Sequence, residues 1–419
     1  MEPILALVGA LLVSFGLVSA KLSRSPLTAP MLFTGVGILV SERSLGWVEL
    51  DLEGHAVHAL GEITLTMVLF GDAARIRLDA LRRELGLPVR LLGIGMPLTI
   101  AAGAGVAKLL MPELTWMEAA TLGTILAPTD AALGQAVVSL SAVPARIRQA
   151  LNVESGLNDG IAVPVVLIFF SLASRTSEGQ TMSEWAIFAT EQVTLGPAAG
   201  LGIAWLGARA IARARKKGWM DESYYRLSGI GIALLCFTVA SAIGGNGFIA
   251  AFVGGMTLGN LQRKYGEPLF ELMEAESQLL MVLVFTVLGG SMLGPAFAEA
   301  RWQDFAYAAA SLTVIRMIPV ALSLVGSGVS GRTVLFLGWF GPRGLASVLF
   351  ALLLLERSGI PHAQQVYTAA MLTVFASVVL HGATAAPFAS AYARSVARAT
   401  DAPEHAEVED HPLRHSTFH

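Results

Sequence analysis

The chain has 419 residues, of which 54% are hydrophobic and 14% are charged, and its mean hydropathy is +0.64. Soluble domains carry about 25% charged residues, so this composition excludes an ordinary soluble protein and indicates an integral membrane protein. The formal net charge is only −3, and the sequence has no basic patch for nucleic acid beyond the basic loops described below. The single cysteine, Cys236, lies in an apolar run and cannot form a disulfide within the chain.

Hydropathy along the chain predicts thirteen membrane-spanning helices, most of them about 20 residues long. No basic residue precedes the first apolar segment, so we interpret it as a spanning helix and not as a cleaved signal peptide. The fold class predicted is an all-α polytopic protein embedded in the lipid bilayer. The predicted spans are 3–20, 26–41, 57–74, 91–111, 115–141, 149–173, 187–208, 226–243, 247–260, 270–293, 305–326, 333–355 and 366–390.

The basic residues separate by loop. Of the 28 Lys and Arg, 21 lie in the odd-numbered loops and the C-terminal tail, five lie in or beside the even-numbered loops, and two lie within spans. The positive-inside rule therefore predicts a cell (inner) membrane protein with its N-terminus outside and its C-terminus in the cytoplasm. The tail, residues 395–419, is polar and rich in His and acid, and we expect it to be disordered.

Two spans contain a proline near their midpoint. Ala127-Pro128-Thr129-Asp130 interrupts the fifth, and Gly338-Trp339-Phe340-Gly341-Pro342-Arg343-Gly344 interrupts the twelfth. A shift of seven spans reverses membrane orientation, so the two breaks predict inverted repeats with paired discontinuous helices. Proline removes a backbone donor at each break. Asp130 is therefore either an ion ligand or a cap for the second half of its own helix, and we favour the cap.

The sixth span carries the polar motif Glu154-Ser155-Gly156-Leu157-Asn158-Asp159-Gly160. Asp159 lies near half-depth in the membrane, where an ionisable side chain is a functional-site hypothesis. On a helix, Ser155 and Asp159 share one face, as do Glu154 and Asn158. We expect Asp159 to bind a cation or a proton, with Ser155, Asn158 and Thr129 supplying neutral groups around it. The alternative is that Asp159 only pairs with a buried base.

Two arginines lie about ten residues into their predicted spans, Arg316 and Arg343, and each needs a negative partner there. We expect Glu154 to pair with Arg316 as a structural charge pair. Arg343 is expected to compensate the broken-helix ends or to meet Asp72, which is otherwise a plausible group in an ion funnel. In the alternative assignment, Glu154 is the proton carrier.

The sequence lacks a P-loop, HExxH, a Cys/His metal spacing and GxSxG. We therefore expect neither a cofactor nor an enzyme, and favour secondary transport driven by an ion gradient.

The chain resembles NhaP-type Na⁺/H⁺ antiporters of the monovalent cation:proton antiporter superfamily. The resemblance covers essentially all spans and leaves out only the tail. The stretches that carry it are Thr129-Asp130, the motif from Glu154 to Gly160, Gly341-Pro342-Arg343-Gly344, the run from Gly245 to Gly255, and the run from Val284 to Gly289.

The resemblance implies a homodimer and an elevator-like mechanism. Within the transmembrane domain, residues 1–394, a core domain (about 91–173 and 305–390) would move against a dimerisation domain (about 3–74 and 187–293). Helices five and twelve would cross as broken helices.

The resemblance also implies site roles. Asp159 would take Na⁺ (or Li⁺) and H⁺ in turn, and Thr129, Ser155 and Asn158 would help with coordination or geometry. Asn158 stands where electrogenic relatives have Asp, which implies electroneutral one-for-one exchange and a role in pH homeostasis. Pro342 departs from the family pattern, and a direct role for Asp72 is in doubt because the acid of relatives is one position away.

Three other functions fit parts of the sequence. A K⁺/H⁺ exchanger of the same superfamily is the nearest alternative, because several ion ligands would be backbone oxygens that do not distinguish the two cations. An intramembrane aspartyl protease could use Asp130 and Asp159, but its Gly-x-Gly-Asp motif is absent. A channel is the third.

Overall fold

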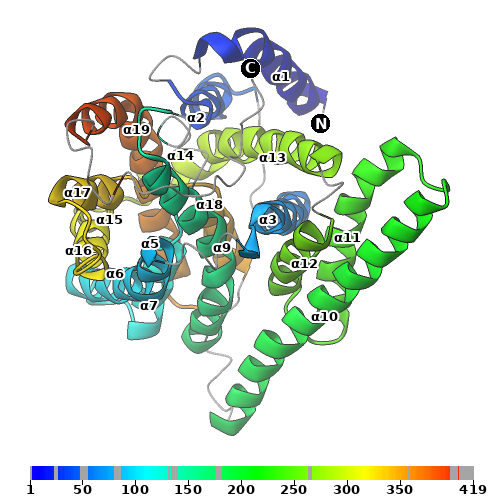
Figure 1. Ribbon diagram of the computed structural model, residues 1–419. Helices are drawn as coiled ribbons and strands as arrows, with labels where there is room; N and C mark the ends of the chain where they lie inside the picture. The colour runs from blue at the N-terminus through cyan, green and yellow to red at the C-terminus, as the bar shows by residue number, and fades with distance from the viewer. Residues whose placement is uncertain are drawn as a thin grey trace.

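A computed structural model gives the arrangement of residues 2–22, 27–47, 55–79, 86–130, 133, 137, 140–174, 182–262, 267–356, 359–396 and 404. The regular structure of these residues is helical and contains no β-strand, which confirms the all-α prediction (Figure 1). Every one of the thirteen predicted spans overlaps at least one of these helices. Seven helical stretches among the described residues are long and apolar enough to cross a membrane, and shorter apolar helices accompany them.

The helices are, in chain order, α1 (Glu2–Leu22), α2 (Ala29–Val40), α3 (His55–Arg75), α5 (Gly86–Arg90), the π-helix η1 (Leu91–Gly95), α6 (Met96–Leu110), α7 (Trp116–Ile125), α9 (Ala145–Ala173), α10 (Met182–Lys216), α11 (Glu222–Ala242), α12 (Gly247–Leu261), α13 (Glu267–Val287), the π-helix η3 (Leu288–Met292), α14 (Leu293–Glu299), α15 (Trp302–Leu312), α16 (Val314–Ser323), α17 (Gly331–Trp339), α18 (Leu345–Glu356) and α19 (Ala363–Val396).

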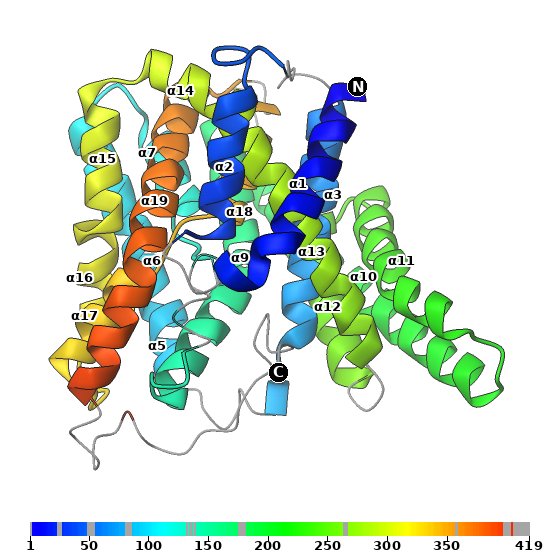
Figure 2. The same cartoon turned by 90° about the horizontal axis from the view of Figure 1, so that it is seen from above.

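The helices pack in two groups. In one, α12 packs against α3, α10 and α11, and α13 packs against α2, α3 and α11. In the other, α7 packs against α6 and α9, and α19 packs against α15 and α18. Figure 2 shows α10 and α11 at one edge of the molecule and α15, α16, α17 and α19 at the opposite edge. Helices α9 and α18 of the second group lie next to the first group, where both contact α3 (Figure 1).

Glycines allow α12 to approach its neighbours closely, as the glycine-rich sequence of this short span predicts. A Cβ atom at Gly255 or Gly259 would overlap the backbone of α3 at Phe70 or Ala74. A Cβ atom at Gly254 would lie 2.6 Å from the Sγ atom of Cys236 in α11. Small residues permit such close helix packing in membranes, and the buried Cys236 thiol fills space as a small apolar group.

The eleventh span departs from the prediction of one continuous helix. It divides into α15 and α16 at Thr313, whose backbone has φ −120° and ψ −97°. The Thr313 hydroxyl donates to the carbonyl of Ala309 at 2.6 Å, a bond that competes with the helix and bends it. Pro319 lacks the backbone donor for the carbonyl of Ile315. Arg316 therefore lies in the first turn of a new helix.

Part of the tail also departs from the expected disorder. Glu404 is 1% exposed, and its Oε1 atom accepts hydrogen bonds from the Ser330 backbone N–H at 2.8 Å and the Thr333 hydroxyl at 2.7 Å. A carboxylate is favourable at this position, the start of α17. Val396 ends α19, and of the residues after it the structure describes Glu404 alone. Residues 395 and 396 of the predicted tail belong to α19, and apart from Glu404 the rest of it lies outside the described residues.

Candidate ion-binding site

The two predicted helix breaks meet. After α7 ends at Ile125, residues 126–130 are not helical, and residues 340–344 separate α17 from α18. The Asp130 backbone N–H donates to the carbonyl of Pro342 at 2.8 Å. The Ser347 hydroxyl donates to the Ile125 carbonyl at 2.8 Å. The two broken spans are therefore joined at their breaks by direct hydrogen bonds.

The Asp130 carboxylate caps a helix of the other broken span, while most of the second half of its own span lies outside the described residues. Its Oδ2 atom accepts a hydrogen bond from the backbone N–H of Leu345 at 2.9 Å, so Asp130 caps the start of α18 in the other broken span. Gly344 provides the space, because a Cβ atom there would overlap the Asp130 carboxylate. A carboxylate at a helix N-terminus offsets the positive end of the helix dipole.

Arg343 compensates the C-terminal end of a helix, whereas Asp130 compensates an N-terminal end. Its side chain is fully buried, and its Nη1 atom donates to the carbonyl of Ala127 at 3.1 Å and that of Pro128 at 3.5 Å. These carbonyls follow α7, where the dipole is negative and the last carbonyls lack helical partners. Of the two partners expected for Arg343, the structure gives it the broken-helix end and not Asp72.

Glu154 and Arg316 form the expected charge pair. Glu154 Oε1 lies 2.6 Å from Arg316 Nη2, and both side chains are 3% exposed. Gly341 lies beside the pair, because a Cβ atom there would overlap the Arg316 guanidinium. A buried charge is stable only with a close partner, so this contact fixes α9 against α16 and next to the break of the twelfth span.

Three of the predicted site residues are in contact, and a fourth is the next residue of α9. The Thr129 hydroxyl lies 3.0 Å from the Ser155 hydroxyl and accepts a hydrogen bond from Asn158 Nδ2 at 2.7 Å. Asn158 Nδ2 also lies 3.4 Å from the Thr129 carbonyl. Asp159 is the next residue after Asn158 in α9 and is 8% exposed. The structure therefore brings an acid, two hydroxyls and an amide to the crossing.

The Oδ1 atom of Asn158 can accept a further ligand. It is buried and accepts no hydrogen bond from the described residues, although buried amide oxygens are nearly always paired. Asn158 Nδ2 is already committed to Thr129. The Asn158 carbonyl therefore has a lone pair available for a cation or a water molecule.

Asp72 is not hydrogen-bonded to the residues of this cluster. It is half-buried in the last turns of α3 and has no hydrogen bond to Thr129, Ser155 or Asn158. A role in the approach of ions stays a prediction.

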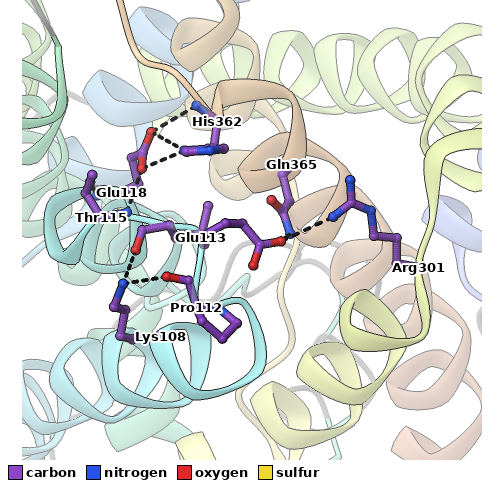
Figure 3. Close-up of polar contacts among 9 residues, drawn as sticks. Lys108, Pro112, Glu113, Thr115, Glu118, Arg301, His362 and Gln365 are labelled. Carbon is purple, nitrogen blue, oxygen red and sulfur yellow. Dashed lines mark hydrogen bonds and ion pairs between the residues drawn. The ribbon is translucent and has the colours of Figure 1, made fainter.

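Sequence analysis missed a second polar cluster, at the start of α7 (Figure 3). Thr115 and Glu118 form a capping box, with Thr115 N donating to Glu118 Oε2 at 2.7 Å and Glu118 N donating to Thr115 Oγ1 at 3.2 Å. The same carboxylate accepts from the His362 backbone N–H at 2.9 Å and lies 3.1 Å from its Nδ1 atom. The T-x-x-E pattern is visible in the sequence, whereas His362 is 244 residues away. Adjacent contacts join Glu113 to Arg301 and Gln365 (Figure 3).

Two broken helices that cross inside a bundle, with buried charged side chains at the helix ends created by the breaks, define a class of membrane transport protein. Comparison with known families agrees. The model described as "Sodium/hydrogen exchanger, transmembrane" matches residues 7–391. The chain belongs to the sodium/hydrogen exchanger family, a family of transporters, which confirms the predicted family.

Two relatives define the extent of the similarity. The chain is 24% identical over 380 residues to a K(+)/H(+) antiporter NhaP2 of Shewanella baltica, covering 90% of this chain and 65% of the relative. It is 24% identical over 376 residues to a K(+)/H(+) antiporter NhaP of Alkalimonas amylolytica, covering 88% of this chain and 64% of the relative. The chain therefore spans slightly less than two thirds of the length of these relatives.

The fold has a solved counterpart. The structure of the sodium proton antiporter MjNhaP1 from Methanocaldococcus jannaschii at pH 8 superimposes with a TM-score of 0.77 and 20% sequence identity. The match covers 94% of this chain and 99% of that chain. This likeness confirms the antiporter fold predicted from the sequence.

Proposed function

We propose that the protein exchanges a monovalent cation for a proton across the membrane, and that Asp159 carries each in turn. The observation that carries the proposal is the polar cluster at the crossing, where the Thr129 hydroxyl contacts Ser155 and Asn158 and Asp159 is the next residue of α9. Glu154 is paired with Arg316 at 2.6 Å, and Asp130 caps α18. Asp159 lies beside the oxygen-rich group of Thr129, Ser155 and Asn158.

The exchange follows from competition. A carboxylate cannot hold a proton and an inner-shell cation at once, so binding of one excludes the other. If the site crosses the membrane readily only when it is occupied, each inward step of one ion is matched by an outward step of the other. Lower pH on the cation side should therefore raise the apparent KM for the cation.

Asp159→Asn in proteoliposomes tests the assignment. We expect it to abolish cation-driven recovery of a pH-sensitive dye, because the amide keeps the size of the side chain but binds no exchangeable proton. Asp221→Asn is the matched control, since Asp221 caps α11 at an exposed position and Asn also caps helices well. Retained cation-driven proton movement in Asp159→Asn would refute the carrier role.

Na⁺ (or Li⁺) is the cation implied by the resemblance, and K⁺ is the second candidate. The relatives in Shewanella and Alkalimonas are named K(+)/H(+) antiporters, whereas the archaeal structural counterpart is named a sodium proton antiporter. Hard oxygen ligands suit each of these ions, so the choice depends on cavity size and ligand number. Replacing Na⁺ by Li⁺ or K⁺ in the same liposome assay distinguishes the candidates, and single-channel current without counterflow would indicate a channel instead.

The protease alternative has little support. The chain belongs to a family of exchangers, and Asp130 accepts the hydrogen bond that starts α18, which removes it from a catalytic pair with Asp159.

Exchange is proposed to be electroneutral. Asn158 contributes an uncharged amide bonded to Thr129, so Asp159 is the one titrating group in the cluster of Thr129, Ser155, Asn158 and Asp159. One charge in each direction moves no net charge. A transport rate that changes when membrane potential is imposed with a K⁺ gradient and valinomycin would contradict this stoichiometry, provided that Na⁺ or Li⁺ is the driving cation.

An elevator-like movement of the core domain against the dimerisation domain is proposed for the crossing. The division of the helices into two packing groups supports this movement. The groups meet where α9 and α18 contact α3. Gly61 of α3 lies next to Leu349 of α18. In a Cys236→Ala background, cross-linking Gly61→Cys to Leu349→Cys should block exchange, and reduction should restore it.

The matched control is a cross-link within one group, between Gly229→Cys of α11 and Leu269→Cys of α13, which lie in contact. We expect it to leave exchange intact. Equal inhibition by the two cross-links would argue against relative movement of the groups. The proposed homodimer is tested by native mass spectrometry, and the proposed N-out, C-in orientation by labelling of single cysteines from either side.

A further inference from the structure

The strongest observation outside the cation cluster concerns α19. Ser377, His381 and Thr384 are polar residues at i, i+4 and i+7 in a helix that is otherwise largely apolar, so they share one face. Ser377 and His381 are at most 1% exposed. A buried histidine in a membrane helix needs partners for both ring nitrogens, and the break of the twelfth span supplies them.

His381 contacts the end of α17 directly. Its Nε2 atom lies 2.9 Å from the carbonyl oxygen of Trp339, the last residue of that helix. The carbonyls of the final helical turn lack backbone partners, so an imidazole N–H is a suitable substitute. The Trp339 indole N–H donates to the Thr384 hydroxyl at 3.0 Å, which attaches the same residue to α19 a second time.

Ser377 contacts the other side of the break. The backbone N–H of Arg343 donates to Ser377 Oγ at 2.6 Å, and Ser377 Oγ lies 3.1 Å from His381 Nδ1. The side chains of Ser377 and His381 therefore hold the segment 340–344 near both of its ends. The chain of bonds runs from Arg343 N–H through Ser377 and His381 to the carbonyl of Trp339.

These contacts specify the protonation of His381. The Trp339 carbonyl can only accept, so Nε2 carries a hydrogen. Nδ1 lies 3.1 Å from Ser377 Oγ and 3.1 Å from the Ser377 carbonyl oxygen, so Ser377 supplies the partners of the second ring nitrogen. Both ring nitrogens are therefore satisfied, Nε2 by the Trp339 carbonyl and Nδ1 by Ser377.

We infer that His381 is a positioning residue for the cation site, acting with Ser377 to fix the unwound segment 340–344. That segment presents the Pro342 carbonyl to Asp130 N–H and the Arg343 guanidinium to the end of α7. Thr129 precedes Asp130 in the opposing break, so the geometry of its hydroxyl depends on that register. The inference rests on the proposed role of Thr129 and Asp159 in cation binding.

The experiment compares His381→Gln with His381→Met in proteoliposomes. A glutamine amide supplies one donor and one acceptor, and we expect its KM for the cation to stay within about twofold of the parent protein. Methionine fills the space but leaves the Trp339 carbonyl unpaired. We expect its KM for the cation to rise about tenfold, which corresponds to about 1.4 kcal/mol. Thr384→Val is the matched control, because it removes the indole contact and keeps both His381 bonds. It should lower thermal stability without changing KM.

Hydrogen exchange of the Arg343 amide gives a readout that does not require transport. It should be faster in His381→Met and in Ser377→Ala, and close to the parent rate in His381→Gln. Equal KM values for the Gln and Met variants, or slow exchange of the Arg343 amide in His381→Met, would overturn the inference. If the parent protein itself fails to exchange cations for protons, the proposed function fails, while the amide exchange still reports whether His381 fixes the segment.

Discussion

Asp130 and Arg343 each compensate the helix end of the other's span. Asp130 Oδ2 accepts from Leu345 N–H at 2.9 Å, at the start of α18, two residues after Arg343. Arg343 Nη1 donates to the Ala127 carbonyl at 3.1 Å, just beyond α7 and three residues before Asp130. Each charged side chain therefore offsets the dipole of a helix end in the other span. Each break is stabilised by a side chain from the opposite break.

The cap on α18 should depend on the acceptor at position 130 more than on its charge. We expect Asp130→Asn to remain folded, because its amide oxygen can accept from Leu345 N–H. Asp130→Ala leaves that buried N–H unpaired and should cost about 1–3 kcal/mol. Thermal unfolding of purified protein in detergent measures the order. Equal midpoints for the Asn and Ala variants would show that the cap contributes nothing.

The pair of Glu154 and Arg316 should behave as one unit. Glu154→Gln strands a buried guanidinium, and the expected loss of stability is about 3–5 kcal/mol. The double variant Glu154→Gln, Arg316→Met removes both charges and should recover most of that loss. A double-mutant cycle of apparent unfolding midpoints tests the coupling. Additive losses would mean that the two side chains act independently.

The crossing should tolerate no side chain at position 344. Gly344→Ala would overlap the Asp130 carboxylate and force α18 away from its cap. We expect it to lower the unfolding temperature and to impair transport. Gly331→Ala at the exposed start of α17 is the control, since a Cβ atom added there would meet nothing within 4 Å. An undisturbed Gly344→Ala variant would show that the two breaks are not in close contact.

The contact of Glu404 with α17 should depend on pH. Burial raises the pKa of the Glu404 carboxyl, but hydrogen bonds from the Ser330 N–H and the Thr333 hydroxyl outweigh burial and hold the pKa below its ordinary value of 4.5. The folded pKa is lowered, so the stabilisation is present above pH 4.5 and is lost as pH falls through the lowered value.

Hydrogen exchange at the Ser330 and Thr333 amides, corrected for its intrinsic pH dependence, measures this loss. Glu404→Gln should exchange faster than the parent protein at neutral pH, and the difference should vanish in acid. A difference that persists under acidic conditions would contradict the titration of Glu404.

Much of this fold could be predicted from the sequence because its signals are local. Apolar length predicts each span, and the proline at each midpoint predicts a break. Glu154 and Arg316 could be paired from the sequence because a buried charge requires a partner of opposite sign and few charges lie at that depth.

Other features had no local signal. The break at Thr313 carries no glycine or proline of its own, and its Oγ1 bond to Ala309 is one that many helical threonines make without a break. His362 reaches Glu118 across 244 residues, and a lone histidine beside an apolar segment does not indicate which acid it meets.

By itself the sequence determined that the chain is helical, where its helices are interrupted, and which polar groups lie within the apolar spans, since each follows from the cost of exposing polar groups to lipid. Only the tertiary structure decided which helix end each buried charge satisfies. Capping its own helix and capping a neighbour give Asp130 the same kind of bond, so sequence chemistry does not distinguish them. The crossing angle and register of the two breaks place Leu345 N–H 2.9 Å from Asp130 Oδ2, and Ser377 and His381 against the twelfth span.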